Sequence, residues 1–477
     1  MYKAYPDLRE ELISGKISCE EITAGYLENI EKGKHLNAFL SVFRQEALAQ
    51  AKLIDQKLRN GTAGKLAGMV VSVKDVLSVK DKPLTCASKI LDNFKALYTA
   101  TSVQRLIDED AIIIGKTNCD EFAMGSSNEN SAFGPVFNPC DETRVPGGSS
   151  GGSAVSVSAD MCMTSLGTDT GGSVRQPAAF CGIIGLKPTY GRISRYGLTA
   201  FASSFDTVGI FSTNITDSAL MLEVMSGYDS NDSTSSRTEP FRFEDLKTVN
   251  THNLVIGIPD EFINSEALQP EIQNKLKFIK DRLVNAGFTV KSVSLPNSRY
   301  SIQTYYILTT AEASSNLARY DGVRYGYRSP KYDSLEEMYT NSRTEGFGSE
   351  VKRRILLGTF VLSAGYYDAY YRKAQKARRL IKNDYTRAFS EVDVIIGPST
   401  PTTAFKIGEK SEEPLQMYLN DIYTTSANIT GNPAVSIPAG TDNLGLPFGI
   451  QITGRDFDEK TIMAFADYLI SDILNHA

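Results

Sequence analysis

The sequence predicts an α/β fold in which helices cover a β-sheet. Apolar strand patterns at 255–258 and 288–294 flank a helical pattern near 266–286. This alternation of strand, helix and strand is typical of a sheet whose faces are covered by helices. Further short apolar runs of strand character lie at 69–76, 111–115, 393–396 and 434–437, and the last two are expected to end at a proline.

Helical patterns occur along the rest of the chain. Residues 18–32 and 37–60 are amphipathic, and Ser18 is a plausible N-cap with Glu21 three residues later. Further helices are expected to open at 154–159 and to fill 350–389 and 457–473. The Ser/Thr/Asp/Asn-rich stretch at 226–253 is interpreted as a surface excursion and not as a domain boundary.

Composition and length limit the classes of protein to which the chain can belong. A chain of 477 residues can bury a large core, and its length alone suggests two or three domains. No apolar run approaches the roughly 18–20 residues of a membrane span. The N-terminus, MYKAYPDLREEL, lacks the features of a signal or transit peptide, so a cytoplasmic location is expected. Six scattered cysteines without a CxxC pair favour reduced thiols over disulfides or a metal site.

The stretch from 147 to 173 has an unusual composition. Its 27 residues hold seven glycines and seven serines, whereas the whole chain has 37 glycines. Glycine allows a close approach of backbone N–H groups, and serine supplies hydroxyl groups for nucleophilic chemistry. A flexible linker is the alternative, but the apolar residues between the glycines argue against it. The stretch is therefore interpreted as part of an active site.

Lys74 lies near the end of the apolar run at 69–76. Such a lysine is usually a solvated charge at a strand end, but a buried one has a lowered pKa and can act as a general base. The chain has only three histidines, His35, His252 and His476, and none belongs to the glycine- and serine-rich stretch. A Ser–Lys arrangement therefore fits the available residues better than a Ser–His–Asp triad.

Lys74, the GGSSGGSA run at 147–154 and GTDTGGSVRQPAAFCG at 167–182 together resemble the amidase signature family. This resemblance implies a Ser–Ser–Lys triad that cleaves amides. Ser173 would be the nucleophile, Ser149 the bridging serine and Lys74 the base. In the family the bridging serine follows a cis peptide bond.

The resemblance also implies a compact α/β/α fold, with a large mixed β-sheet covered by helices on both faces. We expect one domain over 1–477, with N-terminal helices at about 1–60, a catalytic core at about 61–225 and a helical elaboration at about 300–390. An oxyanion hole is expected from the backbone N–H groups around the nucleophile, those of Thr170, Gly171, Gly172 and Ser173.

Longer segments resemble one branch of the family, the ammonia-producing subunits of tRNA-dependent amidotransferases. They lie at 122–135, 186–198, 201–206, 311–326, 351–360 and 417–424, within a similarity that runs from about Leu12 to about Phe465. The resemblance implies that the substrate is glutamine. It also implies two partner subunits in a heterotrimer, with tRNA contacted mainly through a partner.

The same resemblance assigns residues to the substrate. Tyr305, with Tyr306 as an alternative, Arg354 and Asp421 would bind glutamine, Arg354 at the α-carboxylate and Asp421 at the α-ammonium. The alternatives are a surface arginine in a Lys-Arg-Arg cluster and an aspartate that caps a helix. The loop at 124–127, with Gly125 and Ser126, is expected to add contacts.

Asp169 and Arg175 flank the nucleophile motif and are interpreted as orienting or structural groups. No cofactor is expected in this chain. ATP and Mg²⁺ would be used by the assembled complex in a partner subunit, and the chain contains no GxxxxGK[ST] pattern. The net charge of −6 agrees with tRNA binding elsewhere. One local exception is the stretch from Lys352 to Arg387, where Arg and Lys recur along a helical pattern, and it is interpreted as the solvated face of a long helix.

Two other functions remain open. A stand-alone amidase that acts on another small amide would use the same triad. A non-catalytic scaffold with this fold would be expected to lack a triad residue, and the sequence retains all three.

Overall fold

The computed structural model describes residues 4–263, 265–410 and 414–474, whose strands form one 11-stranded mixed sheet. The strand order is β1-β3-β2-β4-β6-β5-β10-β11-β9-β7-β8. The strands are β1 (Phe39–Val42), β2 (Val70–Lys74), β3 (Ile112–Thr117), β4 (Thr164–Asp169), β5 (Ile184–Lys187), β6 (Thr207–Ser212), β7 (Val255–Pro259), β8 (Thr289–Val293), β9 (Val394–Pro398), β10 (Ala434–Thr441) and β11 (Pro447–Gly454).

Two parts of the sheet are parallel. β2 pairs in parallel with both β3 and β4, and β7 pairs in parallel with both β8 and β9. The strands between these parts, β6, β5, β10 and β11, pair antiparallel with their neighbours. Since the carboxyl ends of parallel strands meet at one edge of a sheet, the ends of β2, β3 and β4 gather at the same place.

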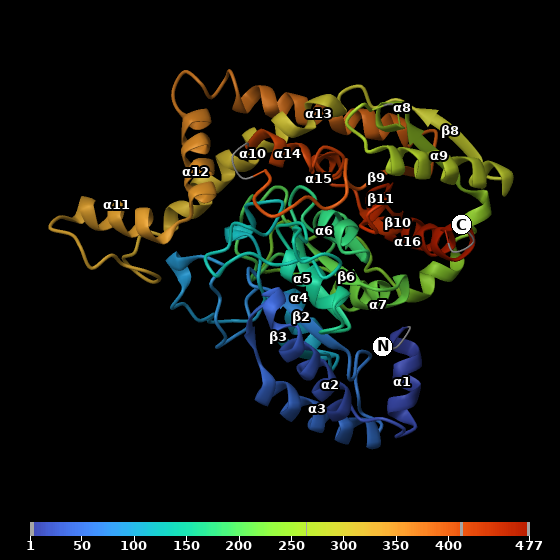
Figure 1. Cartoon of the computed structure of the whole chain (residues 1–477), viewed down its shortest axis with the longest axis horizontal. Coiled ribbons are helices and arrows are strands. Elements are labelled where there is room, and N and C mark those ends of the chain that lie inside the picture. Colours follow the sequence, from blue (N-terminus) through green and yellow to red (C-terminus); the bar gives the residue numbers. More distant parts are fainter. Residues whose placement is uncertain (1–3, 264, 411–413, 475–477) are drawn as a thin grey trace.

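Sixteen α-helices are found in the described residues, and Figure 1 labels most of them. In the first half of the chain they are α1 (Tyr5–Ile13), α2 (Cys19–Lys32), α3 (Arg44–Arg59), α4 (Thr101–Asp108), α5 (Gly151–Ser158), α6 (Arg175–Phe180) and α7 (Ile215–Met225). In the second half they are α8 (Asp260–Ile263), α9 (Pro270–Asn285), α10 (Ser301–Asn316), α11 (Leu335–Gly346), α12 (Ser349–Leu362), α13 (Tyr371–Ala388), α14 (Pro414–Leu419), α15 (Thr425–Thr430) and α16 (Glu459–Tyr468).

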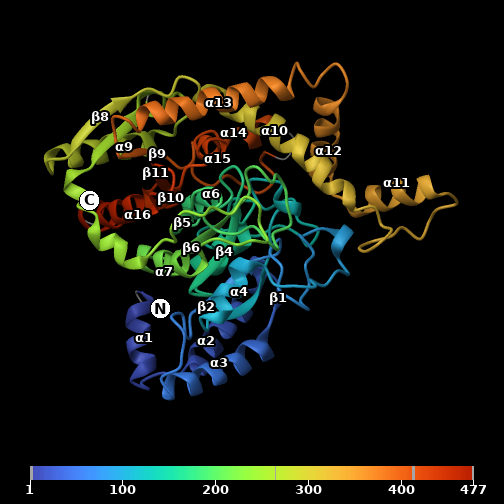
Figure 2. The ribbon, with the colours of Figure 1, turned by 180° about the vertical axis from the view of Figure 1, so that it is seen from behind.

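Helices pack on both faces of the sheet, as predicted. Along β11, Gly449 lies against Ala179 of α6, and Gly454 lies against Ile462 of α16. Positions separated by an odd number of residues point to opposite faces of a strand, so α6 and α16 cover opposite sides. Figures 1 and 2 show α1–α3 at one end of the molecule, α10, α12 and α13 at the other, and α11 projecting away from the body.

Two predicted helices differ from the structure. The helix expected over 37–60 is wrong at its start, because residues 39–42 pair with β3 as an edge strand and α3 begins at Arg44. The helix expected over 350–389 is interrupted between α12 and α13. Gly365 in this connection has φ +88°, a left-handed conformation that an α-helix does not contain.

The other predicted elements are confirmed with small shifts. Ser18 and Glu21 form the expected capping box of α2. α5 begins at Gly151, so part of the glycine-rich loop is helical. β9 ends at Pro398 as predicted, but β10 continues past Pro438 to Thr441, and its register with β11 shifts between Pro438 and Gly440. Among the described residues, no helix is long and apolar enough to span a membrane.

Candidate active site

β2 carries Lys74 into the interior of the protein. All five residues of this strand are buried, and the side chain of Lys74 is fully inaccessible to solvent. Its Nζ lies 2.8 Å from Oγ of Ser149, 2.8 Å from Oγ of Ser150 and 2.9 Å from Oγ1 of Thr168. Burial lowers the pKa of Lys74 to about 8, because a charged ammonium is poorly solvated there. Lys74 is therefore suited to act as a base.

The three hydroxyl groups around Lys74 are not equivalent. The Ser150 hydroxyl donates to the backbone oxygen of Thr168 at 3.2 Å, so its proton is already used and it accepts a hydrogen bond from Lys74. A neutral amine has two protons to donate and one lone pair to accept. With one proton donated to Ser150, the lone pair is left for the hydroxyl of Ser149 or of Thr168.

Ser149 lies in the loop that leads into α5, and the peptide bond between Gly148 and Ser149 is cis, as the resemblance implied. Gln176, on α6, accepts a hydrogen bond from the Gly148 amide at 2.9 Å. A Cβ at Gly148 would lie 2.2 Å from Oδ2 of Asp120, so only glycine fits there. The Asp120 amide in turn donates to the Ser149 carbonyl at 3.0 Å.

Ser173 lies in the turn between β4 and α6, three residues before Gln176. Gln176 therefore links the turn of the nucleophile to the loop of Ser149. Ser173 is 8 % exposed, and its hydroxyl has no hydrogen-bond partner within the described residues. In a protein without substrate, catalytic hydrogen bonds are often too long or poorly aligned. The lack of a partner for the Ser173 hydroxyl is therefore compatible with its role as the nucleophile.

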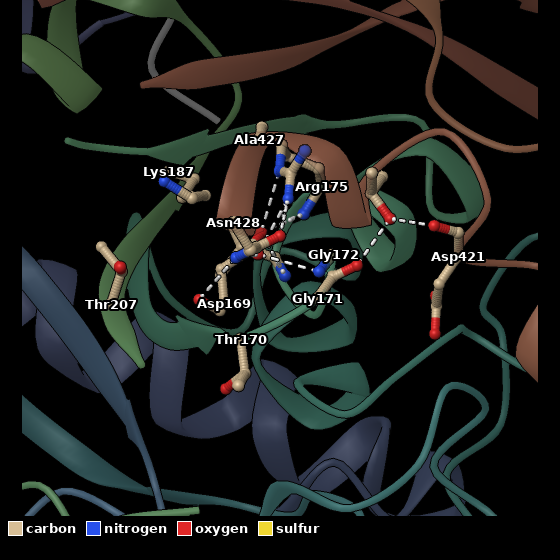
Figure 3. A network of polar contacts seen from close by, with 12 residues as sticks. Asp169, Thr170, Gly171, Gly172, Arg175, Lys187, Thr207, Asp421, Ala427 and Asn428 are labelled. Atoms are coloured by element: carbon tan, nitrogen blue, oxygen red, sulfur yellow. Dashed lines mark hydrogen bonds and ion pairs between the residues drawn. The ribbon is translucent and has the colours of Figure 1, made fainter. Parts of the chain in front are cut away.

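The oxyanion hole differs in part from the prediction. The Gly172 amide donates to Oδ1 of Asp169 at 2.9 Å and is therefore not available to a substrate oxygen (Figure 3). The prediction that Gly172 is one of the donors does not fit this geometry. The amides of Thr170, Gly171 and Ser173 donate no hydrogen bond to other described residues and remain candidates.

Asp169 and Arg175 form a buried ion pair beside the nucleophile turn (Figure 3). Arg175 donates to both oxygens of Asp169 at 3.0 Å, and Asn428 of α15 donates to Oδ1 at 2.8 Å. Burial by itself would raise the pKa of Asp169, but the Arg175 charge holds it at about 2. Both side chains are saturated by these contacts, which supports an orienting role and not a role in proton transfer.

Asp169→Asn is expected to lower the free energy of unfolding by about 3–5 kcal/mol, because it leaves the Arg175 charge buried without its partner. Chemical denaturation of the variant and the wild type measures this difference. The pKa of Asp169 is lowered from 3.8 in the unfolded chain to about 2 in the folded protein. The stabilisation from the charged carboxylate is therefore fully present above pH 3.8 and is lost as the pH falls through about 2. Lys247→Ala, in an exposed ion pair with Glu244, is the control and should change stability far less. Equal losses in the two variants would contradict the prediction.

Ser126 and Asp421 meet across 295 residues of sequence, because the Ser126 hydroxyl donates to Oδ2 of Asp421 at 2.5 Å. Burial raises the pKa of Asp421 to about 7. Thr424, three residues later, donates to the Gly171 carbonyl at 2.7 Å. The structure therefore places the predicted ammonium-binding carboxylate beside the nucleophile turn. The alternative that Asp421 caps a helix has no support, since its carboxylate bonds a side chain from another segment and the N-cap of α15 is Thr424.

Tyr305 and Tyr306 both lie at this site and face different neighbours. A Cβ at Gly171 would lie 2.5 Å from Cζ of Tyr305, so this ring packs directly on the nucleophile turn. The Tyr306 ring has its centroid 5.3 Å from the guanidinium carbon of Arg354. The structure is thus compatible with Tyr305 as the tyrosine that binds the substrate, whereas Tyr306 packs against Arg354. Gly125 is pressed against Asp120, where a Cβ would lie 2.2 Å from its carboxyl carbon.

Arg354 is buried within the site and is not a surface arginine, since only 3 % of its side chain is exposed. Its Nε donates to Oε1 of Glu350 at 2.8 Å. Its two terminal nitrogens donate no hydrogen bond within the described residues. The charge of Arg354 also acts on Asp421, whose pKa it lowers against the larger effect of burial. The site therefore offers a free guanidinium fork and a carboxylate near each other.

Several residues of this site were not predicted from the sequence. Ser150 and Thr168 belong to the motifs around the triad and could have been found as hydroxyl groups near Lys74. Asp120 and Glu350 lie outside the resembling segments, and Tyr418 lies within the one at 417–424, but only the three-dimensional structure identifies their roles. Asp120 accepts hydrogen bonds from the amides at 128 and 130 and so shapes the loop that carries Ser126.

Comparisons with known proteins agree with this geometry. A family model described as Amidase matches residues 21–463. The A subunit of the glutamyl-tRNA(Gln) amidotransferase from Chlorobium phaeobacteroides is 54% identical over 475 residues, which cover 99% of this chain and 100% of that protein. The crystal structure of the glutamyl-tRNA(Gln) amidotransferase A subunit from Thermotoga maritima has 39% identity and a TM-score of 0.79, over 96% of this chain and 93% of that one. A bacterial aryl acylamidase shares the fold alone, with a TM-score of 0.86, 21% identity and coverage of 100% of this chain and 97% of that one.

Proposed function

The chain belongs to the amidase signature family, and from this premise we propose that it is the glutamine-hydrolysing subunit of a glutamyl-tRNA(Gln) amidotransferase. One observation supports the substrate above all: the free fork of Arg354 acts electrostatically on the Asp421 carboxylate, and Thr424, three residues after Asp421, bonds the nucleophile turn. These two groups complement the α-carboxylate and the α-ammonium of a free amino acid. The amide of its side chain then reaches Ser173.

The proposed reaction begins with a proton relay. Neutral Lys74 accepts the proton of Ser149, and Ser149 accepts the proton of Ser173 as the Ser173 oxygen attacks the amide carbon of glutamine. The negative charge that develops on the substrate oxygen is stabilised by the free backbone amides of the turn. The proton returns through Ser149 to the leaving nitrogen, so the C–N bond breaks and ammonia departs. Water then cleaves the glutamyl ester on Ser173 and releases glutamate.

Ammonia from this site would pass to a partner subunit in the same complex. There it would convert glutamate attached to tRNA(Gln) into glutamine, after activation of the glutamate with ATP and Mg²⁺ bound by the partner. Two partner subunits, tRNA contact through a partner and action in the cytoplasm belong to this proposal. The relatives named as A subunits of glutamyl-tRNA(Gln) amidotransferases support an assembly with other subunits.

The test is to assay the purified chain alone and with its two partner subunits, glutamylated tRNA(Gln) and ATP. Release of glutamate from glutamine, together with formation of glutaminyl-tRNA only by the assembled complex, is the expected result. Cleavage of simple amides without any action on glutamine, even with the partners present, would instead make the chain a general amidase. Absence of hydrolysis with every amide would leave a non-catalytic scaffold.

The affinity for glutamine is expected to rise with pH through about 7, the raised pKa of Asp421. The proton must leave this carboxylate before it can pair with the α-ammonium, so KM is higher on the acidic side. Asp421→Asn should remove this dependence and raise KM about 10- to 100-fold, the range for losing a hydrogen bond to a charged group. Steady-state kinetics across the pH range measures both effects. Asp368→Asn, on the exposed turn between α12 and α13, is the control, and a pH-dependent KM that persists in Asp421→Asn would contradict the prediction.

A further inference from the structure

The guanidinium group of Arg354 needs support to act as a fork for a carboxylate. An arginine side chain has many rotamers, and a free one would lose entropy on binding. Here the group lies between three aromatic rings, with its central carbon 5.3 Å from the centroid of Tyr306, 5.6 Å from that of Tyr418 and 5.5 Å from that of Phe201. These rings restrict the plane of the fork. They do not fix its rotation within that plane.

Glu350 supplies the missing constraint. It lies one turn before Arg354 on α12, and its Oε1 accepts the hydrogen bond from Arg354 Nε. This contact engages the inner edge of the guanidinium group and leaves the two terminal nitrogens free. The second oxygen of Glu350 accepts from Arg353, whose side chain is 48% exposed. The inward oxygen of Glu350 thus faces the site, and the outward oxygen faces a partly solvated arginine.

Tyr418 connects this arrangement to α14. Its hydroxyl donates to the same Oε1 of Glu350 at 3.0 Å, and its ring stacks on Tyr306 with centroids 3.9 Å apart. Asp421 follows Tyr418 by three residues and binds Ser126. Glu350 is therefore the point at which the helix that carries Arg354 is joined to the segment that carries Asp421.

We propose that Glu350 and Tyr418 are positioning residues that hold the Arg354 fork toward the α-carboxylate of the substrate, and so set the preference for amides of free amino acids. The pair does not touch the substrate. It fixes the rotation of the fork and the distance between the two groups that bind the ends of glutamine. This inference rests on the proposed function, because it requires a substrate with an α-carboxylate.

Glu350→Ala in the assembled complex is expected to raise KM for glutamine about 10- to 100-fold, because a charged hydrogen bond is lost, while kcat changes less than about threefold. Glu350→Gln should lie between the alanine variant and the wild type. Its amide oxygen can still accept from Arg354 Nε, and its NH₂ group can turn toward the partly exposed Arg353. Tyr418→Phe keeps the stacked ring and loses one hydrogen bond, so KM should rise about 2- to 10-fold.

A double-mutant cycle separates positioning from a general structural role. If Glu350 acts through Arg354, then Glu350→Ala should change KM less than about twofold in an Arg354→Ala background. A purely structural residue would add its full effect there. Arg353→Ala removes the outward partner of the same carboxylate and is the matched control, with KM expected within about twofold of the wild type.

The results distinguish this inference from the function on which it rests. A wild-type complex that does not hydrolyse glutamine overturns both. A wild-type complex that hydrolyses glutamine, with Glu350→Gln and Glu350→Ala both at the wild-type KM, overturns the positioning role alone. The positioning role is also overturned if Glu350→Ala raises KM by the same factor in the Arg354→Ala background as in the wild type. If Glu350→Ala does not fold, Glu350→Gln and Tyr418→Phe decide by the same comparison of KM with kcat.

Discussion

Ser173→Ala is expected to reduce glutamine hydrolysis by at least about 10⁴-fold, because the other hydroxyl group in the turn between β4 and α6, that of Thr170, is bound to Asp206 and does not replace the nucleophile. Release of glutamate from glutamine, followed with the assembled complex, measures the loss. Formation of glutaminyl-tRNA from glutamine should disappear in parallel. Formation from added ammonium salts should remain, since only the source of ammonia has been removed.

Ser158→Ala is the matched control for this prediction. Ser158 ends α5 within the same glycine- and serine-rich stretch, and its hydroxyl donates to the Cys181 carbonyl away from Lys74. Its replacement should leave the rate within about threefold of the wild type, as for a single neutral hydrogen bond. Near-normal hydrolysis by Ser173→Ala would assign the nucleophile elsewhere. Failure of ammonium to restore product would indicate that the variant damages the complex and not only the glutaminase step.

Lys74→Met is the second change expected to abolish activity, with a loss of about 10³-fold or more from the removal of the general base and of its hydrogen bonds. In the wild type, kcat/KM should rise as the pH passes through about 8, the lowered pKa of Lys74. The sign follows from the chemistry, since only the neutral amine accepts a proton from Ser149. The pH profile of glutamine hydrolysis by the full complex measures this rise.

Lys74→Arg should not restore the activity, because a guanidinium group stays protonated and does not act as a base in this pH range. Lys80→Met, at an exposed position shortly after β2, is the control and should behave as the wild type. A Lys74→Met enzyme that keeps both its rate and its alkaline rise would rule out the proposed relay. The hydrogen bonds of Lys74 with Ser149, Ser150 and Thr168 would then have a structural role and not a catalytic one.

The parts of the site that could be predicted depend on short-range patterns. The apolar run around Lys74 predicts a strand, and the glycine- and serine-rich stretch indicates an active site. The choice of Ser173 as the nucleophile and of Lys74 as the base follows from the resemblance to the amidase signature family. Residues 39–42 could not be assigned, because their strand character depends on pairing with β3, which lies more than 70 residues later. The break in the helix at Gly365 was also missed, since the surrounding residues keep a helical pattern.

The oxyanion hole shows a different limit. The glycine-rich turn indicates which amides are available, but the use of the Gly172 amide by Asp169 depends on the conformation of the turn. Glu350 likewise occurs in a charged stretch of α12 that resembles any solvated helix. Only its packing against Arg354 and Tyr418 distinguishes it from the glutamates at the surface. Long-range contacts of this kind carry no signal in a single sequence.

The placement of these residues separates reaction chemistry from substrate choice. Lys74, Ser149 and Ser173 lie on strand ends and loops of the sheet, whereas Tyr305 and Arg354 project from α10 and α12 in the helical layer. Tyr305 of α10, and Thr424 just before α15, contact the nucleophile turn directly. Divergence in the helical layer can therefore retarget such an enzyme to another amide while the hydrolytic apparatus is inherited unchanged.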